Sequence, residues 1–214
     1  MPNVECFPAL AGLPGITHGF TLREPDLDVQ TDRETALARL EAIHTAARRE
    51  LGLGEHAFVT AKQVHGADVR RVTAAEAGRP LVADGLVTND PTVCLGIYVA
   101  DCGAVYLVDP VRRAIGLLHS GKKGSELGIT GRAIELMGAE FGSRPADLVV
   151  QLGPCIRVPR YEVDFAGQIV AQARAAGVVE VHDASTCTAG APERYYSYRR
   201  ELGRTGRMLA LLAL

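Results

Sequence analysis

Three apolar runs in the middle of the chain constrain its fold more than any other feature. They are TVCLGIYVA (92–100), GAVYLVD (103–109) and AIGLL (114–118). Their length and β-branched content are typical of buried strands, and Asp109-Pro110 separates the last two. If the runs form an antiparallel meander, the first and third point the same way. The residues that follow them then meet at one edge of a sheet.

Helical patterns lie on both sides of these strands. Thr31 and Glu34 form a T-x-x-E capping box before an apolar stripe that Gly52 closes, which predicts a helix over 31–52. His44 lies beside that stripe and is expected to be a surface or flank residue. Two further helices are predicted over about 125–141 and 165–176, and two further strands over 147–152 and 207–214. Because helices and strands mix without regular βαβ alternation, the sequence predicts an α+β fold.

Composition narrows the class of protein. No linker rich in glycine, serine or proline divides the 214 residues, so we expect a single domain over 1–214. The net charge of −2, with acids and bases interspersed, gives no reason to expect a nucleic-acid or membrane partner, and the apolar runs are shorter than a bilayer span. Five cysteines without a CxxC pair argue against a disulfide framework and predict a cytoplasmic protein.

A metal site is one interpretation of three residues in this frame. Cys102 and His119 follow the first and third runs, and His65 comes from the earlier segment KQVHG. In the meander, the Cα atoms of Cys102 and His119 lie ~10 Å apart, a span that both side chains close around one ion. A Cys-His-His set leaves a fourth position open, as in catalytic zinc sites, and also suits copper. An inert thiol and hydrogen-bonded histidines are the alternative.

Three other segments carry ambiguous signals. The segment HSGKKGS (119–125) places Lys122 and Lys123 before a predicted helix, which suits phosphate or another anion, although such lysines are commonly just solvated. Cys155 is either a reactive thiol or a buried structural one. The run YYSYRR (195–200) either stacks a base or sugar or packs its aromatic side chains in a sheet.

Ordered blocks along nearly the whole chain resemble one family. The blocks are THGFTLR (17–23), KQVHGADV (62–69), ADGLVT (83–88), ADC with LVDP (100–110), LLHSGKKG (117–124), LGPCIRVPRYEVD (152–164), and DASTCT with YYSYRRELGRTGRM (183–208). The family is that of the multi-copper polyphenol oxidases, or laccase-domain proteins, also described as purine nucleoside phosphorylases of the YfiH and LACC1 type. So many blocks in order make the resemblance specific.

The resemblance implies both a fold and an activity. The implied fold has mixed β-sheets between helical layers (α/β/β/α). His65, Cys102 and His119 are the implied zinc ligands. The implied enzyme phosphorolyses purine nucleosides such as adenosine and inosine, with adenosine deamination as a second activity, so its partners are a purine nucleoside and phosphate. The family's arginine falls on Arg23, which we expect to bind phosphate or substrate, and Asp101 is expected to orient a ligand or move a proton.

Other functions stay open beside this one. They are a cysteine hydrolase or amidase that uses Cys102 with His119 as base, a copper protein that oxidises phenols, and a non-catalytic metal-binding module. The family usually shows HAGWRG where this chain has HSGKKG, so an aromatic surface and a bidentate donor are missing. We expect this departure to affect the substrate more than the metal. The sequence leaves the oligomeric state open.

Overall fold

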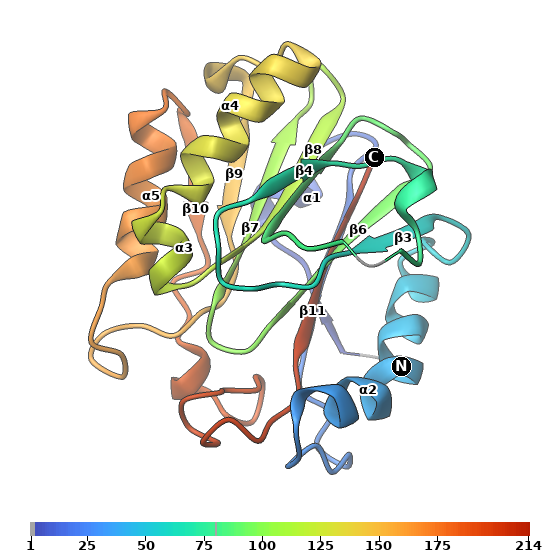
Figure 1. Ribbon diagram of the computed structural model, residues 1–214, viewed down its shortest axis with the longest axis vertical. Coiled ribbons are helices and arrows are strands. Elements are labelled where there is room, and N and C mark those ends of the chain that lie inside the picture. The colour runs from blue at the N-terminus through green and yellow to red at the C-terminus, as the bar shows by residue number, and fades with distance from the viewer. Residues whose placement is uncertain (1–2, 80) are drawn as a thin grey trace.

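The computed structural model describes residues 3–79 and 81–214, which form two mixed β-sheets packed face to face with helices outside them (Figure 1). The first sheet has the strand order β1 (Val4–Glu5), β2 (Thr17–Thr21), β11 (Met208–Ala213), β6 (Val93–Val99), β3 (Ala57–Thr60). The second has the order β10 (Glu180–Asp183), β9 (Val149–Leu152), β7 (Gly103–Asp109), β8 (Ala114–Ser120), β5 (Gly85–Thr88), β4 (Val69–Arg71).

The helices that accompany the sheets are α1 (Pro8–Ala11), α2 (Arg33–Glu50), α3 (Lys122–Glu126), α4 (Ile129–Phe141) and α5 (Phe165–Ala175). Short 3-10 turns lie at Ala74–Glu76, Pro145–Asp147 and Thr188–Gly190. In the part of the chain that the structure describes, no helix combines the length and the apolar character needed to cross a bilayer.

The main core lies between the two sheets. Leu95 and Ile97 of β6 point into it from one sheet, and Tyr106 of β7 and Leu117 of β8 from the other. Each is fully buried, which contributes roughly 1.5–3 kcal/mol per large side chain. The Tyr106 hydroxyl donates a hydrogen bond of 2.9 Å to the carbonyl oxygen of Gly19 and so ties the sheets together. The apolar runs of the sequence are continuous because these strands are covered on both faces.

Helices cover the outer faces of both sheets. On the second sheet, Val105 and Leu107 pack with residues of α4 and α5 such as Met137 and Ile169. On the first sheet, α2 lies against the end of β6, where His44 and Tyr98 have their ring centroids 5.5 Å apart. The expected mixed sheets between helical layers are confirmed.

The three central runs are strands, but the predicted meander is wrong. β7 and β8 pair directly, with Gly103 opposite Ser120, whereas β6 pairs with β3 and β11 in the other sheet. Asp101 takes a left-handed φ of 81°, and with Cys102 it carries the chain across from one sheet to the other. Cys102 therefore directly precedes β7, and His119 lies in the adjacent strand β8, with no strand between them.

Two helix predictions also need correction. The cap of α2 is Asp32, whose carboxylate accepts a hydrogen bond of 3.0 Å from the Thr35 amide, so the helix begins at Arg33 rather than Thr31. The helix expected over 125–141 is split into α3 and α4 because Gly128 takes a φ of 76° between them. His44 is buried rather than at the surface, since α2 lays it on the sheet.

Candidate metal centre

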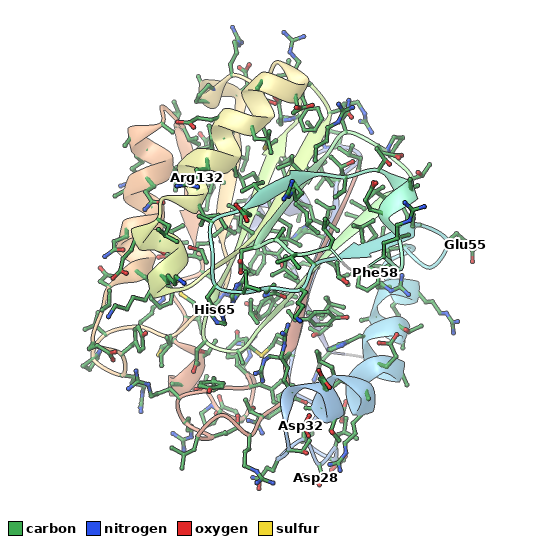
Figure 2. All side chains as sticks on the ribbon, viewed as in Figure 1. Asp28, Asp32, Glu55, Phe58, His65 and Arg132 are labelled. Carbon is green, nitrogen blue, oxygen red and sulfur yellow. The ribbon has the colours of Figure 1, made fainter. Side chains whose placement is uncertain are left out.

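His65, Cys102 and His119 converge at one end of the second sheet. Their potential ligand atoms all lie within 4.8 Å of one another. His65, labelled in Figure 2, lies on the loop between β3 and β4, Cys102 directly precedes β7, and His119 is near the end of β8. The imidazole rings of the two histidines meet edge to face with centroids 4.8 Å apart. Residues from three separate segments thus point at one spot.

The carboxylate of Asp84 fixes the positions of both histidines by hydrogen bonds. It is fully buried and accepts hydrogen bonds from the backbone amides of His65, at 2.9 Å, and Gly66, at 2.7 Å. Its Oδ1 atom also lies 2.8 Å from Nδ1 of His119. When Nδ1 of His119 donates to Asp84, Nε2 is left with its lone pair toward the site, as in the carboxylate–histidine pairs of metal centres.

Asp84 also stabilises an unusual backbone. His65 takes a φ of 60°, in the left-handed region that non-glycine residues rarely adopt. The backbone amides of Val64, His65 and Gly66 at this bend all donate hydrogen bonds to Asp84. No spacing in the sequence distinguishes Asp84, which lies within the block ADGLVT. A residue that orients a neighbouring side chain has no sequence pattern of its own.

Gly121 allows the backbone to pass close to the thiol. A Cβ atom at this position would lie 2.6 Å from Sγ of Cys102, which is closer than such atoms approach in proteins. Any side chain at 121 would therefore force Sγ of Cys102 to move. The glycine after His119-Ser120 is required by the position of the thiol.

The electrostatics of the site favour a thiolate. Burial by itself raises the pKa of Cys102, but the charge of His119 and hydrogen bonds from His119 and His65 outweigh it and lower the pKa to about 6. Burial lowers the pKa of His119, whereas the charge of Cys102 and the hydrogen bond to Asp84 raise it to about 9. A thiolate is the form of cysteine that binds metals.

The residues fit a metal ion. Bonds of ~2.0–2.3 Å to a common tetrahedral ion place its ligands roughly 3.5 Å apart, so small side-chain rotations bring the three donors into position. One thiolate and two imidazoles suit zinc and also copper. Among residues 3–79 and 81–214, no other three His, Cys, Asp or Glu side chains lie close enough together to hold a metal ion. The donor set supports a metal without fixing which one.

The candidate centre opens into a cavity of about 890 Å³. That volume lies within the usual range of small-molecule sites. Its aromatic lining is Tyr98, Tyr161, Phe165 and Tyr198. Its cationic lining is Arg33, Lys122, Lys123, Arg199 and Arg207. The cavity therefore offers flat apolar surfaces beside an excess of positive charge.

The structure separates the other predicted site residues. Lys122 and Lys123 are exposed and line the cavity, although α3, in which they lie, has only 5 residues. Arg23 lies outside the cavity lining, because its guanidinium pairs with Glu201 at 2.6 Å and stacks on Tyr196. Cys155 is fully buried, and burial raises its pKa to about 12, which describes a structural thiol.

Asp101 anchors the loops around the site. Its carboxylate accepts hydrogen bonds from the hydroxyls of Thr188, at 2.6 Å, and Ser197, at 3.0 Å, and from the Arg199 amide, at 2.7 Å. The run 195–200 divides accordingly: Tyr195 and Tyr196 are buried in the core, while Tyr198 is 55% exposed and lines the cavity. Tyr195 and Tyr196 therefore pack in the core but outside any strand, and stacking of a base or sugar on Tyr198 stays a prediction.

Taken together, the packed mixed sheets and the His-Cys-His donor set at the floor of a cavity define a protein with a candidate mononuclear metal centre. The family described as multi-copper polyphenol oxidoreductase laccase matches residues 25–173 and 160–214. The chain belongs to this family.

Named relatives extend this finding. The chain is 32% identical to a purine nucleoside phosphorylase of Deinococcus radiodurans, over 93% of this chain and 89% of that protein. It is 34% identical to the purine nucleoside phosphorylase ORF3 of Streptomyces griseus, over 80% of each. Among solved structures, YlmD from Geobacillus stearothermophilus superposes with a TM-score of 0.86 at 25% identity, covering 97% of this chain and 93% of that one. The hypothetical protein YfiH of Bacillus licheniformis superposes with a TM-score of 0.87 at 24% identity, covering 100% of this chain and 97% of that one.

Proposed function

We propose that this chain is a zinc-dependent enzyme that phosphorolyses purine nucleosides such as adenosine and inosine. The observation that carries the proposal is the convergence of His65, Cys102 and His119 at the floor of a cavity large enough for a nucleoside. The names of the relatives from Deinococcus radiodurans and Streptomyces griseus support the same reaction. Deamination of adenosine is proposed as a second activity of the same site.

The reaction makes two demands on the protein. An oxygen of phosphate forms a bond to the anomeric carbon of the ribose while the bond from that carbon to the purine nitrogen breaks. The purine leaves with the bonding electron pair and takes up a proton, so the products are the free base and ribose 1-phosphate. The site must hold phosphate and sugar in line and stabilise the charge on the leaving base.

The side chains of the cavity match these demands. A purine has the flat shape that stacks on aromatic rings such as those of Tyr161 and Phe165, which lie edge to face with centroids 5.8 Å apart. Lys122 and Lys123 at the rim attract an anion. Asp84 fixes the orientation of His119. A bound zinc ion would supply a Lewis acid at this point of the cavity.

The proposal is tested by product analysis. Metal-free protein loaded with zinc is incubated with adenosine or inosine, with and without phosphate, and free base, ribose 1-phosphate and ammonia are quantified. We expect base release that requires both phosphate and metal. A His65→Ala variant, which removes one ligand, should lose this activity. No base and no ammonia from zinc-loaded protein under either condition would overturn the proposal, and phenol oxidation after copper loading would favour the copper alternative instead.

A second candidate function is hydrolysis of an amide by Cys102. The thiol lies within hydrogen-bonding reach of His119, whose other nitrogen is 2.8 Å from Asp84, and this order of groups is that of a cysteine nucleophile, a base and an orienting carboxylate. A thiol-alkylating reagent should then label Cys102 and abolish activity in metal-free protein. Because Cys6 is more exposed than Cys102, the labelled residue must be identified by peptide mass spectrometry. Activity that disappears with the metal and returns with it contradicts this candidate.

A further inference from the structure

Arg207 is a buried cation beside the metal donors with unused hydrogen-bonding capacity. The residue lies directly before β11, is 9% exposed, and lines the cavity. Its Nη1 atom donates to the carbonyl oxygens of Thr205, at 2.8 Å, and Gly206, at 2.9 Å, which fixes the guanidinium in place. Nε and Nη2 have no partner among the residues that the structure describes, so two parallel donors remain for a ligand.

No carboxylate in the described part of the chain forms an ion pair with Arg207 or with the neighbouring cation Arg33. Arg33 is the first residue of α2 and lines the same cavity. Burial, followed by the charge of Arg33, lowers the pKa of Arg207. A buried cation held near a second cation is unfavourable unless an anion joins them. By contrast, Arg23 and Arg157 each face a carboxylate.

The acidic groups near Arg207 leave room for that anion. The charges of Cys102 and Asp101 act on the guanidinium in the favourable direction. The thiolate, however, is a donor to the proposed metal, and Asp101 is occupied by Thr188, Ser197 and the Arg199 amide. The five cationic side chains of the lining therefore outnumber its acidic groups, which are Asp101, Glu126 and the thiolate.

We infer that Arg207 and Arg33 form a subsite for a tetrahedral phosphate group next to the metal donors. A fixed guanidinium binds two phosphate oxygens with parallel hydrogen bonds, which a lysine cannot reproduce. The identification of the group as orthophosphate, the co-substrate, rests on the proposed function. The same chemistry is offered by the phosphate ester of a nucleotide, so the test includes both.

The test measures binding directly. Inorganic phosphate, and separately adenosine 5′-monophosphate, is titrated into zinc-loaded protein in a calorimeter at fixed ionic strength. The variants are Arg207→Lys, which keeps the charge, and Arg33→Gln, which removes it. Arg132→Gln is a control with the same loss of charge as Arg33→Gln. Arg132 is exposed on α4, as Figure 2 shows, and lies outside the cavity lining. Thermal unfolding of each variant identifies any loss of fold.

We expect Arg207→Lys to weaken phosphate binding by about ten-fold or more, and Arg33→Gln by about three-fold or more, because charged hydrogen bonds and long-range attraction are lost. Arg132→Gln should bind as the wild type does. Arg33→Gln is informative even if Arg207→Lys unfolds. Binding of orthophosphate and of the nucleotide that is equal in the wild type and both cavity variants would overturn the inference. If only the binding of the nucleotide depends on Arg207, the subsite binds the phosphate ester of a nucleotide rather than orthophosphate.

Failure of the subsite and failure of the proposed function give different results. If phosphate binds through Arg207 and Arg33 but no base is released from nucleosides, the subsite stands and phosphorolysis does not. If bases are released and the KM for phosphate is unchanged in both variants, phosphorolysis stands and the subsite does not.

Discussion

The two sides of the cavity are built in opposite ways. On the floor, buried Asp84 accepts hydrogen bonds from three backbone amides and pairs with His119, and Gly121 leaves the space that the thiol of Cys102 occupies. At the rim, Lys122 and Tyr198 are exposed side chains whose heads reach into solvent. The floor is fixed by the backbone and tolerates little change, whereas the rim can change without moving the donors.

This difference explains where the chain departs from the pattern of its family. Lys122 and Lys123 stand where the family usually has a tryptophan and an arginine, and both lie at the rim. Position 121, where the thiol leaves no room for a side chain, is glycine here as in the family pattern. A change at the rim therefore leaves the side chains of the floor in place, and its effect is expected on the ligand that the cavity binds.

The largest effect should follow from Asp84→Asn. The amide group cannot accept from three backbone amides and also pair with His119 as a carboxylate does. We therefore expect the free energy of unfolding to fall by about 3 kcal/mol or more and zinc affinity by about 10- to 100-fold. Urea unfolding and a competitive zinc chelator measure the two quantities. The control is Asp109→Asn, a buried turn aspartate that accepts from the amides of Val111 and Arg112. If both variants kept the same zinc affinity, the floor would not depend on Asp84.

Gly121→Ala sharpens the comparison without changing any charge. The new Cβ would displace Sγ of Cys102, and we expect zinc affinity to fall by about ten-fold or more. Gly131→Ala is the matched control, because nothing lies within 4 Å of a Cβ at that position of α4. Zinc affinity measured in both variants decides the point. Unchanged affinity in Gly121→Ala would mean that the thiol is not a ligand or can shift freely.

The buried imidazole of His44 should make the stability of the metal-free protein depend on pH. Burial lowers the pKa of His44 to about 4, against an ordinary 6.5, so the unfolded chain binds more protons between those values. Its contribution to stability is complete above pH 6.5 and is lost as the pH falls toward 4, with a slope of up to about 1.4 kcal/mol per pH unit.

In metal-free protein, His44→Gln should remove this slope, as measured by urea unfolding across that range. Replacement of the partly exposed His182 by Gln is the control, and that variant should retain the slope. An acid slope of the same size in the His44 variant would show that another group is responsible. His44 is 163 positions from Arg207, whose carbonyl oxygen lies 3.2 Å from its Nε2, so the titration also reports on the wall of the cavity.

The smallest effect is expected at the rim. The double variant Lys122→Gln with Lys123→Gln should raise the KM for nucleoside or phosphate by less than about ten-fold, because exposed charges attract a ligand weakly in water. Zinc content and unfolding should not change. In high salt, the wild type should approach the variant. A loss of zinc in this variant would show that the floor and the rim are not independent.

The sequence predicted the strands of the site better than their arrangement. Hydrophobic runs identify β6, β7 and β8 because buried strands leave a continuous apolar signature. They do not say which sheet a strand joins, so the turn at Asp101 was predicted as a reversal within one sheet. The actual crossing depends on contacts of β6 with β3 and β11, which lie far away in the sequence.

The donor residues could be predicted, but their supports could not. Cysteine and histidine are recognisable as ligands by their chemistry, and their positions at strand ends indicate a common edge. Asp84 and Gly121 act through backbone amides and close approach, which appear only when the chain is folded. Arg23, expected from the resemblance to bind substrate, is instead paired with Glu201.

The central claim is that His65, Cys102 and His119 hold one metal ion on which activity depends. The most direct test is the metal content of the purified chain by mass spectrometry, wild type against His65→Ala, with the unfolding temperature of both measured. We predict about one zinc ion per wild-type chain and a small fraction of that in the folded variant. Equal metal content in the two proteins, or a wild type that takes up no zinc or copper when supplied, would contradict the account.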